Sequence, residues 1–171
     1  MITNALSEIF KPLGLAKDPS ILYNTFAPYY QKLLGGILLF DKEIGVFTDA
    51  QVTVLENGPV RATILVKSRW GSSTLEQKFS LLPGSKQLEV RTKLDWHERR
   101  KMLKLRFQTA LEQPEAFYEV PYGVMQRPAD GEEEPGIRWT AIKGSNRGFA
   151  LLNNNTYSSS VKDNILCQTV K

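Results

Sequence analysis

The stretch Leu88-Glu-Val-Arg-Thr-Lys-Leu-Asp-Trp-His-Glu-Arg-Arg-Lys-Met-Leu-Lys-Leu-Arg-Phe107 decides the fold class. In its first half every second side chain, from Leu88 to Trp96, points one way, and the polar residues between them point the other way. This period of two is typical of a half-buried antiparallel strand. The alternation slips near Arg99 and restarts on the way to Phe107. The stretch therefore predicts two long strands joined at a polar corner, residues 95–99, which holds the chain's only histidine.

Similar patterns and turn signals extend on both sides of this stretch. Further strands are predicted at Ile37–Phe40, Gln51–Leu55, Val60–Lys67, Leu75–Leu81, Phe117–Tyr122, Trp139–Ile142, Gly148–Leu152 and Ile165–Val170. Asn57-Gly58 is a strong hairpin signal because both residues tolerate positive φ, and residues 127–136 read as an acidic loop. Short turns between consecutive strands favour an antiparallel meander. The predicted fold is all-β, an antiparallel β-sandwich.

The first 45 residues differ in character from the rest. They are predicted to form a helical or irregular lead-in (1–45) to a β-sandwich domain over residues 46–171. Leu6, Ile9 and Leu13 follow a helical spacing, and a second helix is predicted from Pro19 to Leu34, with an interruption at Pro28. The chain stops at Lys171 inside a predicted strand. We therefore expect the sandwich to be truncated at its C-terminus.

Composition restricts the broad class of protein. The 171 residues are 42% hydrophobic and 23% charged, which is ordinary for a soluble domain. The net charge of +4 is spread along strand faces, so we expect no nucleic-acid partner. No apolar run approaches the roughly 20 residues that span a bilayer, and the start does not resemble a secretory signal. A single cysteine, Cys167, fits a reducing compartment. The predicted localisation is cytoplasmic.

The residue types also restrict catalysis. Zinc needs three or four ligands, commonly His or Cys, and the chain has one of each, so no metal site is predicted within it. A triad using His97 and Asp95 is disfavoured because no nucleophile motif accompanies it. A glycosidase-type carboxylate pair stays open, with candidates Asp95, Glu98, Glu119 and Glu132–Glu134. The last three are expected to be a solvated loop, with a surface for a basic partner as the alternative.

Several segments, taken together, are similar to the C-terminal region of the family 38 glycoside hydrolases, the α-mannosidases. The resemblance covers about residues 50–160. It is carried by Val54-Leu-Glu-Asn-Gly-Pro-Val-Arg-Ala-Thr63, Leu94-Asp-Trp-His-Glu-Arg-Arg-Lys-Met-Leu-Lys104, Tyr118-Glu-Val-Pro-Tyr-Gly-Val-Met-Gln-Arg-Pro128, Arg138-Trp139, Gly148-Phe-Ala-Leu-Leu-Asn153 and Tyr157. Residues 1–45 match it poorly.

The resemblance implies a "supersandwich" domain similar to galactose mutarotase, present as a partial copy without the catalytic domain. The parent would be a retaining exo-α-mannosidase whose zinc, nucleophile and acid/base carboxylate belong to an N-terminal domain. This chain would therefore need no cofactor of its own. Its expected partners are that catalytic domain and a mannose-containing oligosaccharide. Apolar surface left open by the missing domain would favour a homo-oligomer.

On this reading the chain has no catalytic residue and serves packing. Its polar and aromatic strand interruptions are where contacts to the rim of a substrate pocket are expected. The candidate rim residues are Asp95, His97, Glu98, Arg99, Tyr118, Tyr122 and Arg127. Two alternatives are an independent carbohydrate-binding module, with exposed aromatics as sugar platforms, and a self-contained enzyme.

Overall fold

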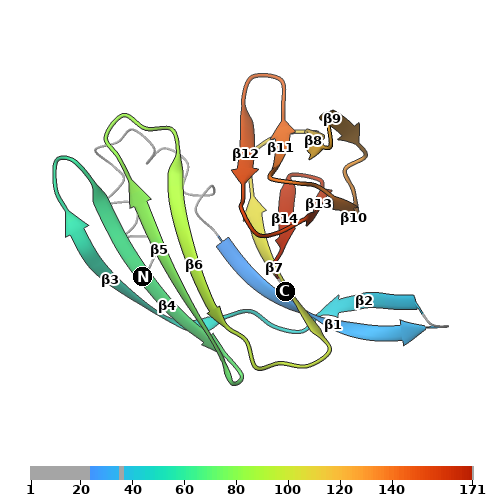
Figure 1. Cartoon of the computed structure of the whole chain (residues 1–171), viewed down its shortest axis with the longest axis horizontal. Coiled ribbons are helices and arrows are strands. Elements are labelled where there is room, and N and C mark those ends of the chain that lie inside the picture. The colour runs from blue at the N-terminus through green and yellow to red at the C-terminus, as the bar shows by residue number, and fades with distance from the viewer. Residues whose placement is uncertain (1–23, 35–36, 171) are drawn as a thin grey trace. The chain divides into compact units, whose positions relative to one another are not determined.

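The computed structural model describes the backbone of residues 24–34 and 37–170 and the side chains of residues 43–170 (Figure 1). Within these ranges every secondary-structure element is a β-strand, and the strands form three antiparallel sheets. This confirms the all-β prediction. The chain divides into two compact units. The described part of the first is Gly45–Arg100, and that of the second is residues 24–34, 37–44 and 101–170. No described helix is long and apolar enough to cross a membrane.

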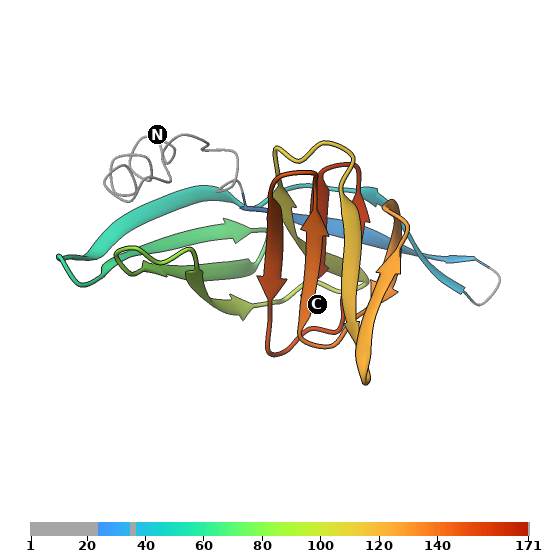
Figure 2. The same cartoon turned by 90° about the horizontal axis from the view of Figure 1, so that it is seen from above.

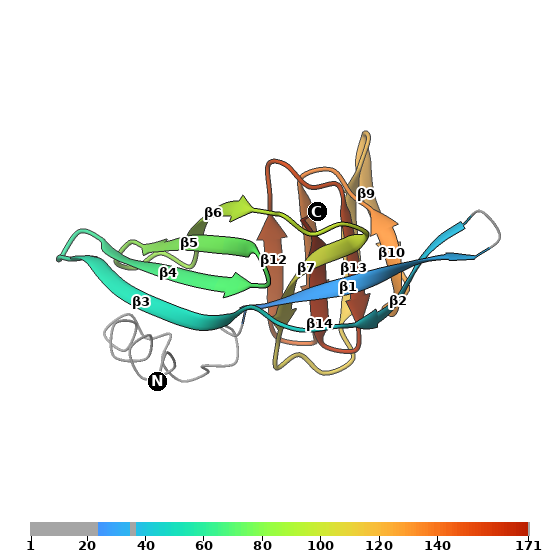
Figure 3. The same cartoon turned by 90° about the horizontal axis from the view of Figure 1, so that it is seen from below.

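The first unit contains one four-stranded sheet, in the order β3-β4-β5-β6 (Figure 3). Its strands are β3 (Thr48–Asn57), β4 (Ala62–Trp70), β5 (Ser73–Leu81) and β6 (Leu88–Asp95). Sequential neighbours pair throughout, so the predicted meander is confirmed. One face is apolar because the register sets Ile64 opposite Phe79 and Leu75 opposite Leu94. Ile64, Leu75 and Phe79 are buried on that face.

Two hairpin turns of this sheet differ in length. Asn57 pairs with Ala62, so the predicted hairpin exists but its loop spans residues 58–61, closed by Gly58 N donating to Arg61 O at 3.1 Å. The β4–β5 turn is a tight two-residue loop in which Gly71 has a φ of +57°. A glycine at the first position with positive φ matches the twist of the flanking strands.

The second unit is a sandwich of two sheets (Figure 2). One has the order β10-β13-β14-β7-β1-β2 and the other β12-β11-β8-β9. The strands are β1 (Asn24–Leu34), β2 (Ile37–Glu43), β7 (Lys101–Gln108), β8 (Glu115–Val120), β9 (Gly123–Arg127), β10 (Asp130–Pro135), β11 (Trp139–Lys143), β12 (Gly148–Leu152), β13 (Ser158–Lys162) and β14 (Ile165–Thr169).

The core of the sandwich is supplied by both sheets. Phe107, Val161 and Leu166 come from the six-stranded sheet, and Tyr118 and Ile142 from the four-stranded sheet. Tyr118 and Leu166 are fully buried. Successive side chains of a strand point to opposite faces of its sheet, so the residues before and after each core residue point to the outer face. One consequence is that polar side chains on the outer face, such as Lys104, are held in defined rows.

Three predictions about the elements need correction. The helix predicted from Pro19 to Leu34 is wrong where the structure describes it, because Asn24–Leu34 is strand β1. β2 pairs with β1 only from Tyr29 onward, so Pro28 has a neighbouring strand on one side, where a proline is tolerated. The helical spacing over residues 6–13 lies outside the described residues.

The loop predicted over residues 127–136 is also wrong, because it contains the end of β9 and all of β10. The carboxylates of this segment form ion pairs and accept hydrogen bonds from hydroxyl groups of other strands. The acidic segment can therefore form a strand at the edge of the sheet. The third correction concerns β13, which was not predicted. Its sequence, Ser158-Ser-Ser-Val-Lys162, has little of the branched and aromatic character that marks strands.

Candidate functional site

The polar corner lies where the chain leaves the first unit and enters the second. Strand β6 ends at Asp95, Arg100 has a φ of +55°, and β7 begins at Lys101 in the other unit. The Nε2 atom of His97 lies 3.0 Å from Asp95 Oδ1, and more than half of each side chain is exposed. Arg99 is exposed as well. The two predicted strands therefore belong to different sheets, and the corner is the crossing between them.

The corner is attached to the β4–β5 turn by three contacts. Trp96 stacks on Trp70, with 6.1 Å between ring centroids. The backbone N–H of His97 donates to the Oγ of the fully buried Ser73 at 2.9 Å. The Ser72 N–H donates to Glu98 Oε1 at 3.3 Å. These contacts give Glu98 and Trp96 a bracing role, and they leave Asp95, His97 and Arg99 accessible.

Replacement of Gly71 by alanine is expected to destabilise the chain more than the same change at Gly84. Both residues have a positive φ, +57° and +71°, which costs an alanine about 1 kcal/mol. A Cβ at Gly71 would also lie 2.5 Å from Glu98 Oε1, whereas a Cβ at Gly84 would meet nothing within 4 Å. Because Glu98 Oε1 is the end of a flexible side chain, the added cost is mainly the loss of its hydrogen bond with Ser72. We therefore expect losses of about 2 and about 1 kcal/mol respectively in urea unfolding.

The comparison should be repeated with Glu98→Ala as the background. There the carboxylate is gone, so the extra cost at Gly71 should shrink to the value at Gly84. Equal losses at the two glycines in the original chain would show that Glu98 does not occupy the turn.

The other candidate segment is the hairpin of β8 and β9 in the second unit. Tyr118 lies in the core and is fully buried. It could therefore influence a ligand only indirectly, by positioning neighbouring residues. The guanidinium of Arg127 lies 5.2 Å from the centroid of the Tyr118 ring and donates to Glu134 Oε2 at 2.7 Å and to the Pro135 carbonyl at 2.8 Å. Burial raises the pKa of Tyr118 to about 12, and the carboxylate of Glu134 adds to this. The phenol is therefore neutral at physiological pH.

Tyr122 is the most prominent residue of this hairpin. Its side chain is fully exposed at the turn between Val120 and Gly123, and its φ is +65°. A bulky side chain in the left-handed region is uncommon and strained. Val124 is also exposed on the adjoining edge strand β9. The tip of the hairpin therefore exposes two apolar side chains that contribute little to the core of this unit.

The acidic segment holds a network that the sequence did not indicate. Glu133, predicted to be solvated, accepts hydrogen bonds from Lys104 Nζ and Thr169 Oγ1, and from Ser158 Oγ at 2.8 Å. Burial alone would raise the pKa of Glu133, but these hydrogen bonds and the charge of Lys104 outweigh it and lower the pKa below the ordinary carboxyl value. This carboxylate thus joins β10 to β7, β13 and β14.

The seven predicted rim residues are divided between the units, four in the first and three in the second. Arg127 lies beside the Tyr118 ring, whereas Tyr122 is at the opposite end of β9, and neither unit holds the whole set. Their assignment to a pocket rim stays a prediction.

Among the described side chains, no group of three or more His, Cys, Asp or Glu residues is placed to hold a metal. The absence of a metal site from this chain stays a prediction.

Comparison with known proteins identifies the domain. The model of the glycosyl hydrolases family 38 C-terminal domain matches residues 38–167. Alpha-mannosidase 2C1 of Mus musculus is 34% identical over 103 residues, which is 56% of this chain and 10% of the mouse protein. Alpha-mannosidase G of Dictyostelium discoideum is 24% identical over 170 residues, 92% of this chain and 16% of that protein. The chain thus spans only a small part of the curated relatives that it matches.

Solved structures agree on the fold. An alpha-mannosidase from Enterococcus faecalis superposes with a TM-score of 0.74 at 16% sequence identity, covering 86% of this chain and 22% of that chain. A second structure from the same organism, a protein in the glycosyl hydrolase family 38, gives the same values. Together with the family match over residues 38–167, these comparisons show that the chain belongs to the family of glycosyl hydrolase family 38 C-terminal domains.

Proposed function

We propose that this chain is the non-catalytic C-terminal β portion of an α-mannosidase. The observation that supports this most is the family match over residues 38–167, together with relatives that are named alpha-mannosidases. The parent enzyme hydrolyses terminal α-mannosidic bonds with retention of configuration. In such a reaction one carboxylate attacks the anomeric carbon while a second protonates the leaving oxygen and later activates water. Both carboxylates and the zinc belong to the catalytic part, and this chain packs against that part.

The chain also supplies residues to the rim of the sugar pocket, and Tyr122 is the strongest candidate. Strain in the backbone persists where the surroundings enforce it and is common at binding sites. Tyr122 is fully exposed at a φ of +65°, so burial of its side chain within the chain does not offset the backbone strain. An exposed aromatic ring is well suited to stack on the apolar face of a sugar. Arg127 lies at the opposite end of β9 and is paired with Glu134, so its fixed guanidinium contributes no net charge.

A Tyr122→Gly variant separates a binding role from a folding role. Glycine tolerates this φ, so the isolated chain should be stabilised by about 0.5–1 kcal/mol. In an α-mannosidase that carries this domain, the same change should lower kcat/KM by about five-fold or more if a stacking contact is lost. Val124→Ala, on the exposed edge beside it, is the matched control and should change neither value. Unchanged kinetics with Tyr122→Gly would remove Tyr122 from the rim.

Titration of the isolated chain with mannose and mannobiose tests whether it binds sugar without the catalytic part. We expect no saturable change in intrinsic tryptophan fluorescence or in NMR shifts, because the proposed rim is completed only by the catalytic part. Saturable binding at millimolar sugar or below would instead favour an independent carbohydrate-binding module, with exposed rings such as Tyr122 and Tyr157 as its platforms.

A further inference from the structure

A basic pocket lies on the outer face of the six-stranded sheet, away from the sandwich core. Its volume is about 260 Å³. Eight residues line it: Lys104 and Arg106 from β7, Gly131 from β10, Ser160 and Lys162 from β13, Asp163 from the turn that follows, and Ile165 and Cys167 from β14. The pocket is thus built by four strands of one sheet, and the predicted rim residues do not contribute to it.

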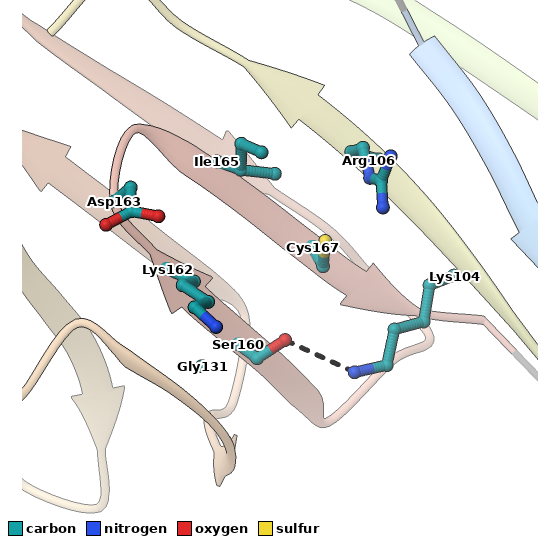
Figure 4. Close-up of a pocket in the computed structure, with 8 residues that line it drawn as sticks. All are labelled: Lys104, Arg106, Gly131, Ser160, Lys162, Asp163, Ile165 and Cys167. Carbon is teal, nitrogen blue, oxygen red and sulfur yellow. Dashed lines mark hydrogen bonds between the residues drawn. The ribbon is translucent and has the colours of Figure 1, made fainter. Parts of the chain in front are cut away.

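The strand register sets the positions of the polar groups. Cys167 is paired with Arg106 on one side and with Ser160 on the other. Figure 4 shows Cys167 at the centre, with Lys104 and Arg106 on one side of it and Lys162 on the other. Ser160 and Cys167 are nearly buried and form the floor. Three cationic side chains therefore surround a floor that carries a hydroxyl and a thiol.

Two of the cations are fixed in place by carboxylates, and the third is not. Lys104 pairs with Glu133, and Arg106 Nη2 lies 2.7 Å from Glu43 Oε2. Lys162 is exposed and has no carboxylate within ion-pair distance among the described residues. Among the lining residues, three cationic side chains thus stand against one carboxylate, that of Asp163, and Lys162 is the cation that no ion pair holds.

The floor offers a hydrogen-bond donor. Lys104 Nζ donates to Ser160 Oγ at 3.2 Å, so the serine oxygen acts as an acceptor there. The serine's own proton remains available to an acceptor above the floor. Gly131 keeps that space open, since a Cβ there would lie 3.1 Å from the Lys162 side chain and its φ of +94° favours glycine. Asp163 is the only carboxylate among the lining residues, and it lies at the exposed β13–β14 turn.

We propose that this pocket binds a small oxyanion, either free phosphate or the phosphate group of a small ester. Lysine and arginine N–H donors and a hydroxyl donor on a nearly buried floor are the partners that phosphate oxygens take in proteins. The volume is below the roughly 300–1,000 Å³ of pockets that hold drug-sized ligands, so it suits a phosphate with a short organic tail. This site is independent of the proposed mannosidase role, and its failure would leave that role untouched.

NMR titration of the full chain tests the site with three probes: inorganic phosphate, glycerol 3-phosphate and glycerol. We expect saturable shifts from the two phosphates, confined to amides of β7, β13, β14 and the residue 131 region, and none from glycerol. Tighter binding of the ester would identify a phosphorylated small molecule as the ligand, and tighter binding of phosphate would identify the free ion. Equal shifts from glycerol, or shifts that stay linear in phosphate, would overturn the proposal.

Two lysine variants sharpen the result. Lys162→Gln removes the cation that has no carboxylate partner and should weaken phosphate binding about ten-fold, the loss expected for one charged hydrogen bond. Lys143→Gln, on the four-stranded sheet of the same unit, is the matched control and should leave the affinity unchanged. Ser160→Ala should weaken binding while the folded spectrum is retained. The same affinity in all three variants would refute the site.

Discussion

Replacing Tyr118 by alanine is expected to lower the free energy of unfolding by about 3–5 kcal/mol, the usual cost of deleting a buried aromatic ring. Tyr118 is fully buried in the core cluster that joins the two sheets of the second unit. Its ring also supports the guanidinium of Arg127. Urea unfolding should show the loss, and the thiol of the buried Cys167, in the same unit, should react faster with a thiol reagent.

Tyr118→Phe is the informative companion, and we expect it to be neutral or stabilising. The phenol oxygen is buried and has no hydrogen-bond partner among the described residues. An unsatisfied buried hydroxyl costs about 1–3 kcal/mol, and phenylalanine removes it while filling the same space. A loss of more than about 1 kcal/mol for Tyr118→Phe would mean that the hydroxyl group has a partner in solution.

Breaking the Lys104–Glu133 pair should produce the other large effect. The side chains of Lys104 and Glu133 are 12% and 30% exposed, so this is a mostly buried ion pair. Lys104→Met leaves the carboxylate of Glu133 without its cation, and one-sided removal of a buried partner costs about 3–5 kcal/mol. Glu133→Gln also removes the counter-charge of Lys104, but its amide oxygen still accepts hydrogen bonds and Lys104 keeps its bond to Ser160. It should therefore cost less, about 1–3 kcal/mol.

The pH dependence of stability provides a second measure of this pair. The pKa of Glu133 is lower in the folded chain than the ordinary value of 4.5, so the unfolded chain binds this proton more readily. Its contribution is therefore fully present above the ordinary value and is lost as pH falls through the lowered folded value. Glu133→Gln should flatten that part of the curve of unfolding free energy against pH.

An exposed ion pair on the other unit is the matched control. Glu56 and Arg61 are joined at 2.7 Å, but their side chains are 42% and 52% exposed. Solvent screening makes such pairs weak. Glu56→Gln should therefore hardly change the unfolding curve at neutral pH. A loss equal to that of Glu133→Gln would show that burial does not govern the strength of the Glu133 network.

The part of the fold that could be predicted from the sequence is the set of strands in which apolar and polar residues alternate. The meander β3-β4-β5-β6 was predictable because each strand has one apolar face and each turn is short. Strands β10 and β13 were not, since Glu133 and Ser160 carry no hydrophobic pattern. They are strands because long-range partners, Lys104 and Thr169 among them, satisfy their side chains. β1 was missed for a related reason, because its pairing with β7 is a tertiary contact that overrides a local helical pattern.

The candidate residues show the same division. The corner and the Tyr118–Arg127 hairpin could be picked out as polar interruptions of regular strands. Their burial could not, so the sequence did not separate the buried Tyr118 from the exposed Tyr122. The basic pocket could not be predicted from the sequence, because only the pairing of three strands brings Lys104, Lys162 and Cys167 close together.

If this domain is, as proposed, a non-catalytic part of an α-mannosidase, it should not hydrolyse an aryl α-mannoside by itself. The isolated chain should be assayed with added zinc, beside a full-length family 38 α-mannosidase as positive control. We predict no turnover above the blank for the isolated chain, at any zinc concentration that activates the control. Zinc-dependent release of the aryl group by the isolated chain would contradict the proposal.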